Sequence, residues 1–181
     1  MKHDGIAGEA GYGATAKSLH WLIVALLVVQ FALAWTMPHI RRGTKPEGLI
    51  AWHLWVGATI LLVSVLRFAW RLARPVPLVT TNVPAWQNGV ARAVHIVLAV
   101  LVIALPLMGW ANASARGWRV SLFGLLTLPP LVRVESPFGR ALGDIHTLTA
   151  EVILVVIGLH VLAAVYHHFL RRDAVLRRML P

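Results

Sequence analysis

The 181-residue chain contains no cysteine and only 7 acidic residues. Without cysteine it has no disulfide, no thiolate metal site, no iron–sulfur ligation and no Cys-x-x-Cys-His attachment of c-type haem. Charged residues make up 13% of the sequence, about half the share that is usual in a water-soluble domain. A disordered chain is excluded too, because 58% of the residues are apolar. Any cofactor must therefore be bound through nitrogen or oxygen atoms, and nine histidines supply candidates.

Four long hydrophobic runs dominate the rest of the sequence. They cover residues 18–38, 50–69, 91–111 and 145–169. A helix rises about 1.5 Å per residue, so each run is long enough to cross a hydrocarbon core of about 30 Å. The net charge of +10 does not indicate a nucleic-acid partner, because basic nucleic-acid modules lack repeated runs of this kind. The sequence predicts an all-α integral membrane protein, built as a four-helix bundle.

The charges and connections predict how this bundle is organised. We expect a flexible N-terminal tail (1–17), one transmembrane domain (18–170) and a basic C-terminal tail (171–181). No Ala-x-Ala site follows the first run, so we do not expect a cleaved signal peptide. The side that holds both tails carries ten basic residues against seven opposite, which predicts cytoplasmic termini. The longest connection contains an apolar stretch, 122–131, that is too short to span and predicts an interfacial hairpin or short helix.

Histidines inside the hydrophobic runs point to a cofactor, because ionisable side chains at membrane depth are costly and usually face a functional interior. His146 and His160 lie in the last run, 14 residues apart. At 100° per residue they share one helix face, about 21 Å apart along the axis. A bis-histidine haem b needs two imidazoles at equal depth on facing helices, and a four-helix bundle can hold such a group.

The other spans supply histidines at complementary depths. His53 begins the second run near the outer surface, at the depth of His146, and His20 begins the first run at the depth of His160. These pairs predict two stacked haem b groups. His95 lies at a similar inner depth and competes with His20 for the inner group. A zinc site is a weaker alternative, because His146 and His160 are too far apart to share one ion with bonds of about 2 Å.

Short motifs that occur together in one known protein family are spread over about nine tenths of the chain. They are SLHW at 18–21, HLWVG at 53–57, RPVP at 74–77, ALPLMG at 104–109, and the tail from GLH at 158–160 through YHHF at 166–169 to LRRMLP at 176–181. With these motifs the chain resembles the bacterial cytochrome b-561 family, the short four-helix dihaem proteins of the inner membrane. The best-described activity of that family is superoxide:ubiquinone oxidoreductase.

The resemblance implies haem b ligation by His20, His53, His146 and His160, and it selects His20 over His95. It also implies electron transfer from superoxide at the periplasmic face to ubiquinone near the cytoplasmic face, in a lipid membrane and without an obligate protein partner. Gly57 lies one turn from His53, where an absent side chain lets a porphyrin approach the helix. The alternative function is a haem b membrane anchor that passes electrons between a periplasmic dehydrogenase or hydrogenase and quinone.

The cytoplasmic end contains candidates for quinone binding. His167 follows His160 by 7 residues, so it lies on nearly the same helix face, about 10 Å nearer the cytoplasm. It is placed to exchange a proton as quinone becomes quinol, although a helix cap is an equal reading. Lys17, Arg74 and Arg171 are candidates for a quinone carbonyl, or are positive-inside charges only.

Two further features of the outer half complete the sequence-based predictions. The outer side carries seven basic and three acidic residues, and a positive face raises the arrival rate of anions such as superoxide. Lipid headgroups are the competing ligands for these arginines. Glu151 is an acid within a hydrophobic run, and we expect it to form an interhelix hydrogen bond. The arginines predicted to act on the anion are Arg116, Arg119, Arg133 and Arg140.

Overall fold

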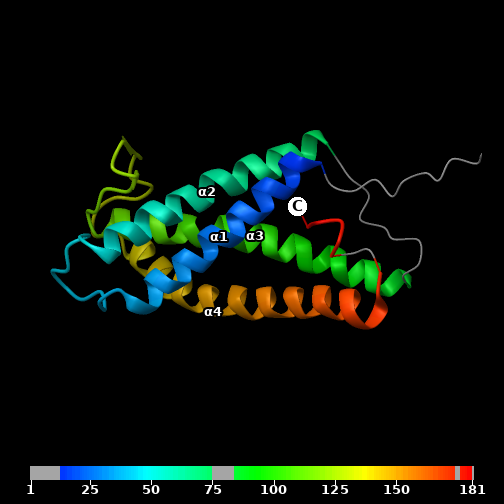
Figure 1. Ribbon diagram of the computed structural model, residues 1–181. Helices are drawn as coiled ribbons and strands as arrows, with labels where there is room; N and C mark the ends of the chain where they lie inside the picture. The colour runs from blue at the N-terminus through cyan, green and yellow to red at the C-terminus, as the bar shows by residue number, and fades with distance from the viewer. Residues whose placement is uncertain (1–12, 75–83, 174–175, 181) are drawn as a thin grey trace, which may run out of the picture.

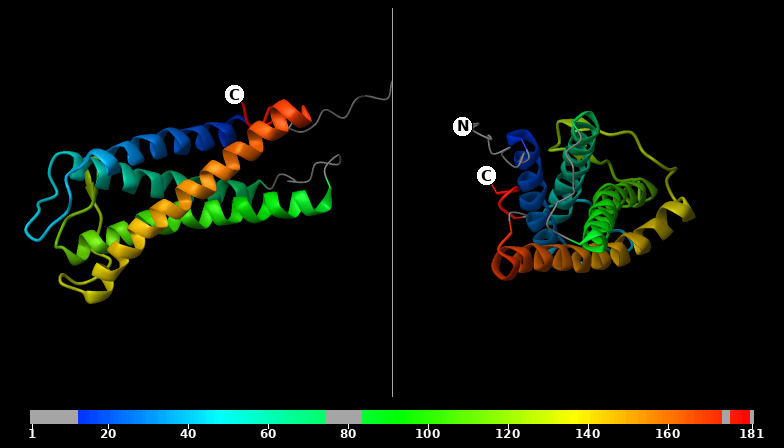
Figure 2. Two further views of the ribbon diagram at one scale, coloured as in Figure 1. Left: turned by 90° about the horizontal axis from the view of Figure 1, so that it is seen from below. Right: turned by 90° about the vertical axis from the view of Figure 1, so that its right-hand side faces the viewer.

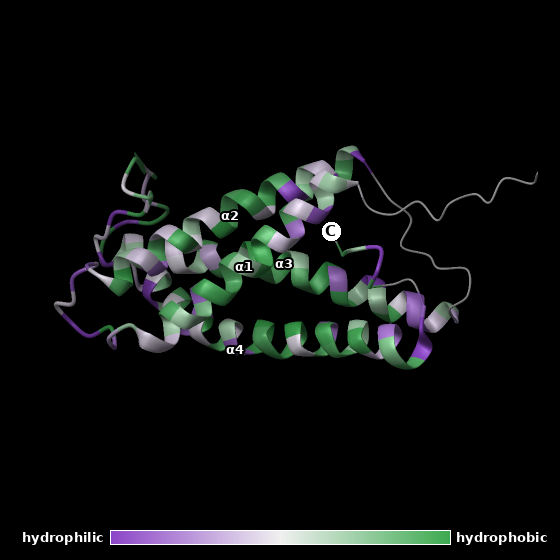
Figure 3. Cartoon of the chain, in the orientation of Figure 1, coloured by the Kyte–Doolittle hydropathy of each residue, from purple (hydrophilic) through white to green (hydrophobic). Residues whose placement is uncertain are grey.

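The computed structural model describes residues 13–74, 84–173 and 176–180. Four helices account for most of them: α1 (Ala14–Thr36), α2 (Leu49–Ala73), α3 (Ala85–Ala115) and α4 (Pro137–Tyr166). A π-helical turn, η1 (His167–Arg171), continues α4. Each of the four helices is long and apolar enough to cross a membrane, and Figure 3 shows apolar residues along the length of each. The predicted all-α membrane bundle is confirmed.

Local signals in the sequence explain where the helices begin and end. The hydroxyl of Ser136 accepts a hydrogen bond from the backbone N–H of Gly139, and Pro137 occupies the first turn of α4. The residue before α2 is Gly48, whose φ of 57° falls in the left-handed region that favours glycine. Both α3 and α4 begin earlier than the hydrophobic runs, so these helices extend beyond the apolar segments.

Each helix packs against its neighbour in sequence, as α1–α2, α2–α3 and α3–α4 (Figures 1 and 2). Two glycines permit the close crossing of α3 and α4 at the loop end of the bundle. A Cβ on Gly139 would lie 2.7 Å from the Cβ of Ala115, and one on Gly143 would lie 2.7 Å from the side chain of Asn112. Among the described residues the α1 and α4 backbones do not touch, although side chains of both helices line one pocket.

The connection between α3 and α4 folds over one end of the bundle. It contains two short antiparallel strands, β1 (Ser121–Leu122) and β2 (Leu126–Thr127), so a hairpin rather than a helix forms in the apolar stretch. Val120 packs with Ala58 of α2 and Ala113 of α3 in a small buried core. The same end of the bundle therefore holds the hairpin and the beginning of α2.

Candidate functional site

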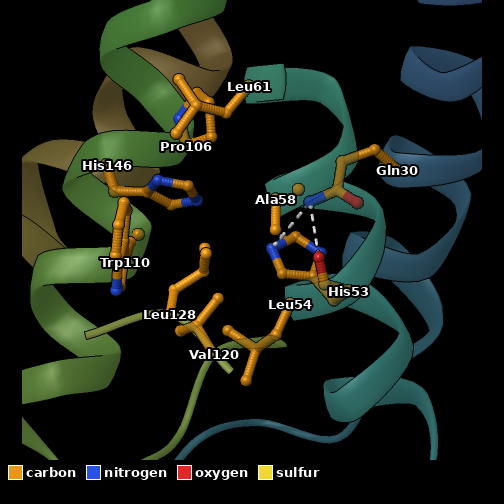
Figure 4. Close-up of a pocket in the computed structure, with 12 residues that line it drawn as sticks. Gln30, His53, Leu54, Ala58, Leu61, Pro106, Trp110, Val120, Leu128 and His146 are labelled. Atoms are coloured by element: carbon orange, nitrogen blue, oxygen red, sulfur yellow. Dashed lines mark hydrogen bonds between the residues drawn. The ribbon is translucent and has the colours of Figure 1, made fainter. Parts of the chain in front are cut away.

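Two histidines from different helices face each other beneath the hairpin. His53 of α2 and His146 of α4 have ring centroids 6.2 Å apart, with ring planes at 79° (Figure 4). Two imidazoles that bind one metal ion through facing nitrogens, with bonds of about 2 Å, hold their centroids roughly 6 Å apart. The separation of His53 and His146 therefore fits two imidazoles that would hold one iron between them.

The hydrogen bonds of the two rings determine which ring nitrogen has a lone pair that could bind a metal ion. Nδ1 of His146 donates to the carbonyl oxygen of Leu105, 2.9 Å away, which fixes the ring and leaves Nε2 with its lone pair. Nε2 of His53 accepts a hydrogen bond from the side-chain amide of Gln30 at 3.2 Å, and that amide also donates to the His53 carbonyl at 3.1 Å. Nδ1 of His53 is buried and has no partner among the described residues. Both Nε2 atoms thus carry lone pairs, as iron ligation requires.

Two glycines line this site, Gly109 against the ring of His146 and Gly57 against the side chain of Gln30. A Cβ on Gly109 would lie 3.1 Å from Cε1 of His146, and a Cβ on Gly57 would lie 3.2 Å from the amide nitrogen of Gln30. At each position the absent side chain makes room for the group that packs there, the His146 imidazole against α3 and the Gln30 amide against α2. The pocket between the histidines is otherwise mainly apolar and receives residues from all four helices, including Leu27, Ile60, Pro106 and Ile153.

Gln30 and the packing role of Gly109 were not among the predicted features of the site. Gln30 is a polar residue in the middle of the first hydrophobic run, which is the signal that indicates an inward-facing side chain. Gly109 is the last residue of the ALPLMG motif. The sequence of α3 alone does not show that the ring of His146, on another helix, packs against this glycine.

A second group of histidines lies nearer the other end of the bundle. His160 of α4 and His95 of α3 make an edge-to-face contact with centroids 5.2 Å apart. Nδ1 of His95 donates to the carbonyl of Ala91 at 2.6 Å. His20 of α1 lies within electrostatic range of both rings, and so does Arg67 of α2. The structure therefore brings three histidines to one level, with His95 in ring contact with His160.

Beyond this level the C-terminal segment folds back onto α1. Nδ1 of His167 donates to the carboxylate of Asp173 at 2.5 Å, and both side chains are mostly buried. Arg172 has a φ of 52°, which reverses the chain direction. The Lys17 ammonium donates to the carbonyl of Leu180 at 2.6 Å, and the Trp21 indole N–H donates to the carbonyl of Met179 at 2.8 Å.

The remaining predicted cations have different surroundings. Arg74 stacks on the ring of Trp70 at 4.8 Å, and Arg116 lies over Trp118 at 5.5 Å. Arg140 forms an ion pair of 2.5 Å with Glu135. Three of the other predicted cations are exposed: Arg119, Arg133 and Arg171.

Comparison with known proteins identifies the family. A family model described as prokaryotic cytochrome b561 matches residues 11–181. The chain belongs to the prokaryotic cytochrome b561 family. Its membership confirms the resemblance noted in the sequence, and it means that the chain is a membrane electron-transfer protein of a haem b type. Within the described parts of the chain, no cluster of three or more His, Cys, Asp or Glu side chains is placed to hold a metal ion.

Individual relatives of the cytochrome b561 family align over nearly the whole chain. A Yersinia pestis protein named probable superoxide oxidase CybB is 32% identical over 174 residues, which are 94% of this chain and 96% of that protein. Cytochrome b561 homolog 2 of Escherichia coli strain K12 is 27% identical, with coverage of 93% and 90%. Cytochrome b562 of Cereibacter sphaeroides is 24% identical, with coverage of 95% and 96%.

Proposed function

We propose that this cytochrome is a superoxide:ubiquinone oxidoreductase of the bacterial inner membrane, with both termini in the cytoplasm. Two superoxide ions lose one electron each and become dioxygen at the periplasmic face. One ubiquinone gains those two electrons and two protons and becomes ubiquinol near the cytoplasmic face. The name of the Yersinia pestis relative and the excess of basic residues on the side of the termini support the proposal.

We assign the outer haem b to His53 and His146, and the inner one to His20 and His160. Bound haem b supplies one-electron redox chemistry at each level. The observation that carries the assignment is the facing His53–His146 pair, with the Nδ1 atom of His146 fixed by Leu105. Gln30 contacts the Nε2 atom through which His53 would bind iron, so its amide has to turn away for ligation.

The structure brings both His20 and His95 near His160, so it does not select between them as the second ligand of the inner haem. We choose His20 because the family resemblance implies it. His95 is the nearer ring, and its Nδ1 hydrogen bond leaves Nε2 with its lone pair. We propose that His20 and His160 would hold the inner haem and that His95 would pack beside it.

At the cytoplasmic end we assign proton transfer to His167. Asp173 accepts from Nδ1 and orients the ring, so Nε2 is the atom that exchanges a proton with a quinone oxygen. Lys17 and Arg74 are proposed to contribute positive charge near that oxygen, in addition to their contacts with Leu180 and Trp70.

Haem stoichiometry in purified single-histidine variants tests these assignments. We expect two haems per wild-type chain by pyridine haemochrome, one in His146→Ala, one in His20→Ala and two in His95→Ala. A single haem in the wild type would refute the dihaem proposal. Loss of a haem from His95→Ala together with retention of both in His20→Ala would make His95 the inner ligand.

A further inference from the structure

One face of α4 is exposed along most of the length of the helix. Leu148, Val155 and Leu162 are 62%, 63% and 66% exposed, and Glu151 and Gly158 are exposed between them. A Cβ on Gly158 would have no atom within 4 Å. We call these five residues the α4 seam.

The α4 seam has the spacing of a helix–helix interface. Its members follow one another at alternating intervals of three and four residues, which is the heptad spacing of two supercoiled helices. At 100° per residue they fall within an arc of about 80°. The centre of that arc is roughly 160° from His146 and from His160, so the seam points away from the histidine sites.

Glu151 makes this face unlike an ordinary lipid-facing surface. It lies 14 residues after the start of α4 and 20 before the end of η1, well inside the apolar span. The predicted interhelix hydrogen bond is not formed among the described residues, where Glu151 has no hydrogen bond or ion pair. The hydroxyl of nearby Thr147 donates instead to the carbonyl of Gly143. A carboxyl at membrane depth is costly unless another polar group pairs with it.

We propose that the α4 seam binds the α4 seam of a second copy of this chain. Two copies inserted with the same orientation have parallel α4 helices, so a two-fold axis along the membrane normal brings each seam residue against its own counterpart. A neutral carboxyl both donates and accepts, so two Glu151 side chains satisfy each other without any other partner. Gly158 lets the two backbones approach closely, and one polar residue in an apolar seam fixes the register.

Cysteine cross-linking in membranes tests the proposed geometry, since the natural chain has no cysteine to interfere. Val155→Cys and Leu162→Cys place a thiol on the seam. Val161→Cys and Val152→Cys are matched controls, because these side chains are 51% and 46% exposed at nearly the same depth but lie off the seam. We expect mild oxidation to give dimers at least several-fold faster for the seam variants, since a disulfide needs Cα atoms within about 7 Å. Equal rates on and off the seam would overturn the proposal.

Substitutions of Glu151 test the role of the carboxyl, with dimer content measured by photobleaching of labelled chains in lipid vesicles. Glu151→Leu is expected to weaken dimerisation about 3- to 30-fold, whereas Glu151→Gln, whose amide also donates and accepts, stays within about threefold of wild type. Haem content confirms that each variant is folded. A monomeric wild type would overturn the proposal, and so would a Glu151→Leu variant that dimerises normally but no longer reduces quinone, because the seam would then bind quinone.

Discussion

Gly109 shows how one missing side chain shapes the outer histidine site. The ring of His146 lies where a Cβ on Gly109 would be only 3.1 to 3.2 Å from two ring atoms, closer than an ordinary van der Waals contact. The same ring is fixed by the Leu105 carbonyl on α3. One short stretch of α3 therefore sets both the position and the tautomer of His146, the proposed haem ligand on α4.

Gly109→Val should therefore remove the outer haem selectively. The two added methyl groups need the space of the His146 ring, and the ring would have to leave its hydrogen bond with Leu105. We expect about one haem per chain instead of two, measured by pyridine haemochrome against protein content. Gly89→Val is the matched control on the same helix, because a Cβ there has no atom within 4 Å. Two haems in Gly109→Val would show that the ring adopts another position when the cofactor is bound.

At the scale of elements, the end of α4 and the segment that follows it form a connection to α1. The π-helical turn and the left-handed Arg172 bring Asp173 back to His167, and the following residues bond to Lys17 and Trp21 of α1. The C-terminal segment thus links the last helix to the first, which do not touch through their backbones in the described chain. His167 is thereby held between these two helices, as the proposed proton-transfer role requires of an acid–base group.

Asp173→Asn should slow quinone reduction without changing the haem content. The amide does not hold Nδ1–H of His167 by a charge-assisted bond, so the ring loses its fixed orientation. We expect reoxidation of reduced haem by a ubiquinone analogue to be about tenfold slower, with an altered pH profile, and reduction of haem by superoxide to be unchanged. Asp173→Glu should restore part of the rate, and Asp144→Asn at the other end of α4 should have no effect. Equal reoxidation rates in Asp173→Asn and wild type would contradict a proton-transfer role for this pair.

The number of helices was predictable from hydrophobic length alone, because a span has a minimum length that the sequence displays directly. Other features depend on contacts between elements. The return of the C-terminal segment rests on two backbone carbonyls, which carry no residue-specific signal. Depth arithmetic placed His20 and His95 at the same level, but only the packing of α3 against α4 brings His95 into contact with His160. Glu151 was recognised as unusual, yet its exposure depends on which face of α4 packs against α3.

At the scale of the whole molecule, the outer arginines differ in what they contribute to the electric field. The pairing of Arg140 with Glu135 leaves no net charge at that position. Arg116 keeps its charge but packs over Trp118. Arg119 and Arg133 are exposed and have no ion-pair partner among the described residues, so no neighbouring carboxylate offsets their charges. Net charge, rather than the number of arginines, determines long-range attraction.

The rate of haem reduction by superoxide should therefore follow net charge. We expect the wild-type rate to fall steeply between about 10 mM and 1 M salt, because the Debye length shrinks from about 30 to 3 Å. Arg119→Gln/Arg133→Gln removes two positive charges and should slow the reaction about tenfold at low salt, with a flatter salt dependence. Glu135→Gln/Arg140→Gln removes an ion pair of zero net charge and is the matched control, expected to leave both rate and salt dependence unchanged.

If the two double variants slow the reaction equally, the arginines act through local structure rather than attraction. A wild-type rate that is indifferent to salt would mean that the positive outer face does not guide the donor, and the assignment of superoxide would then rest on family membership alone.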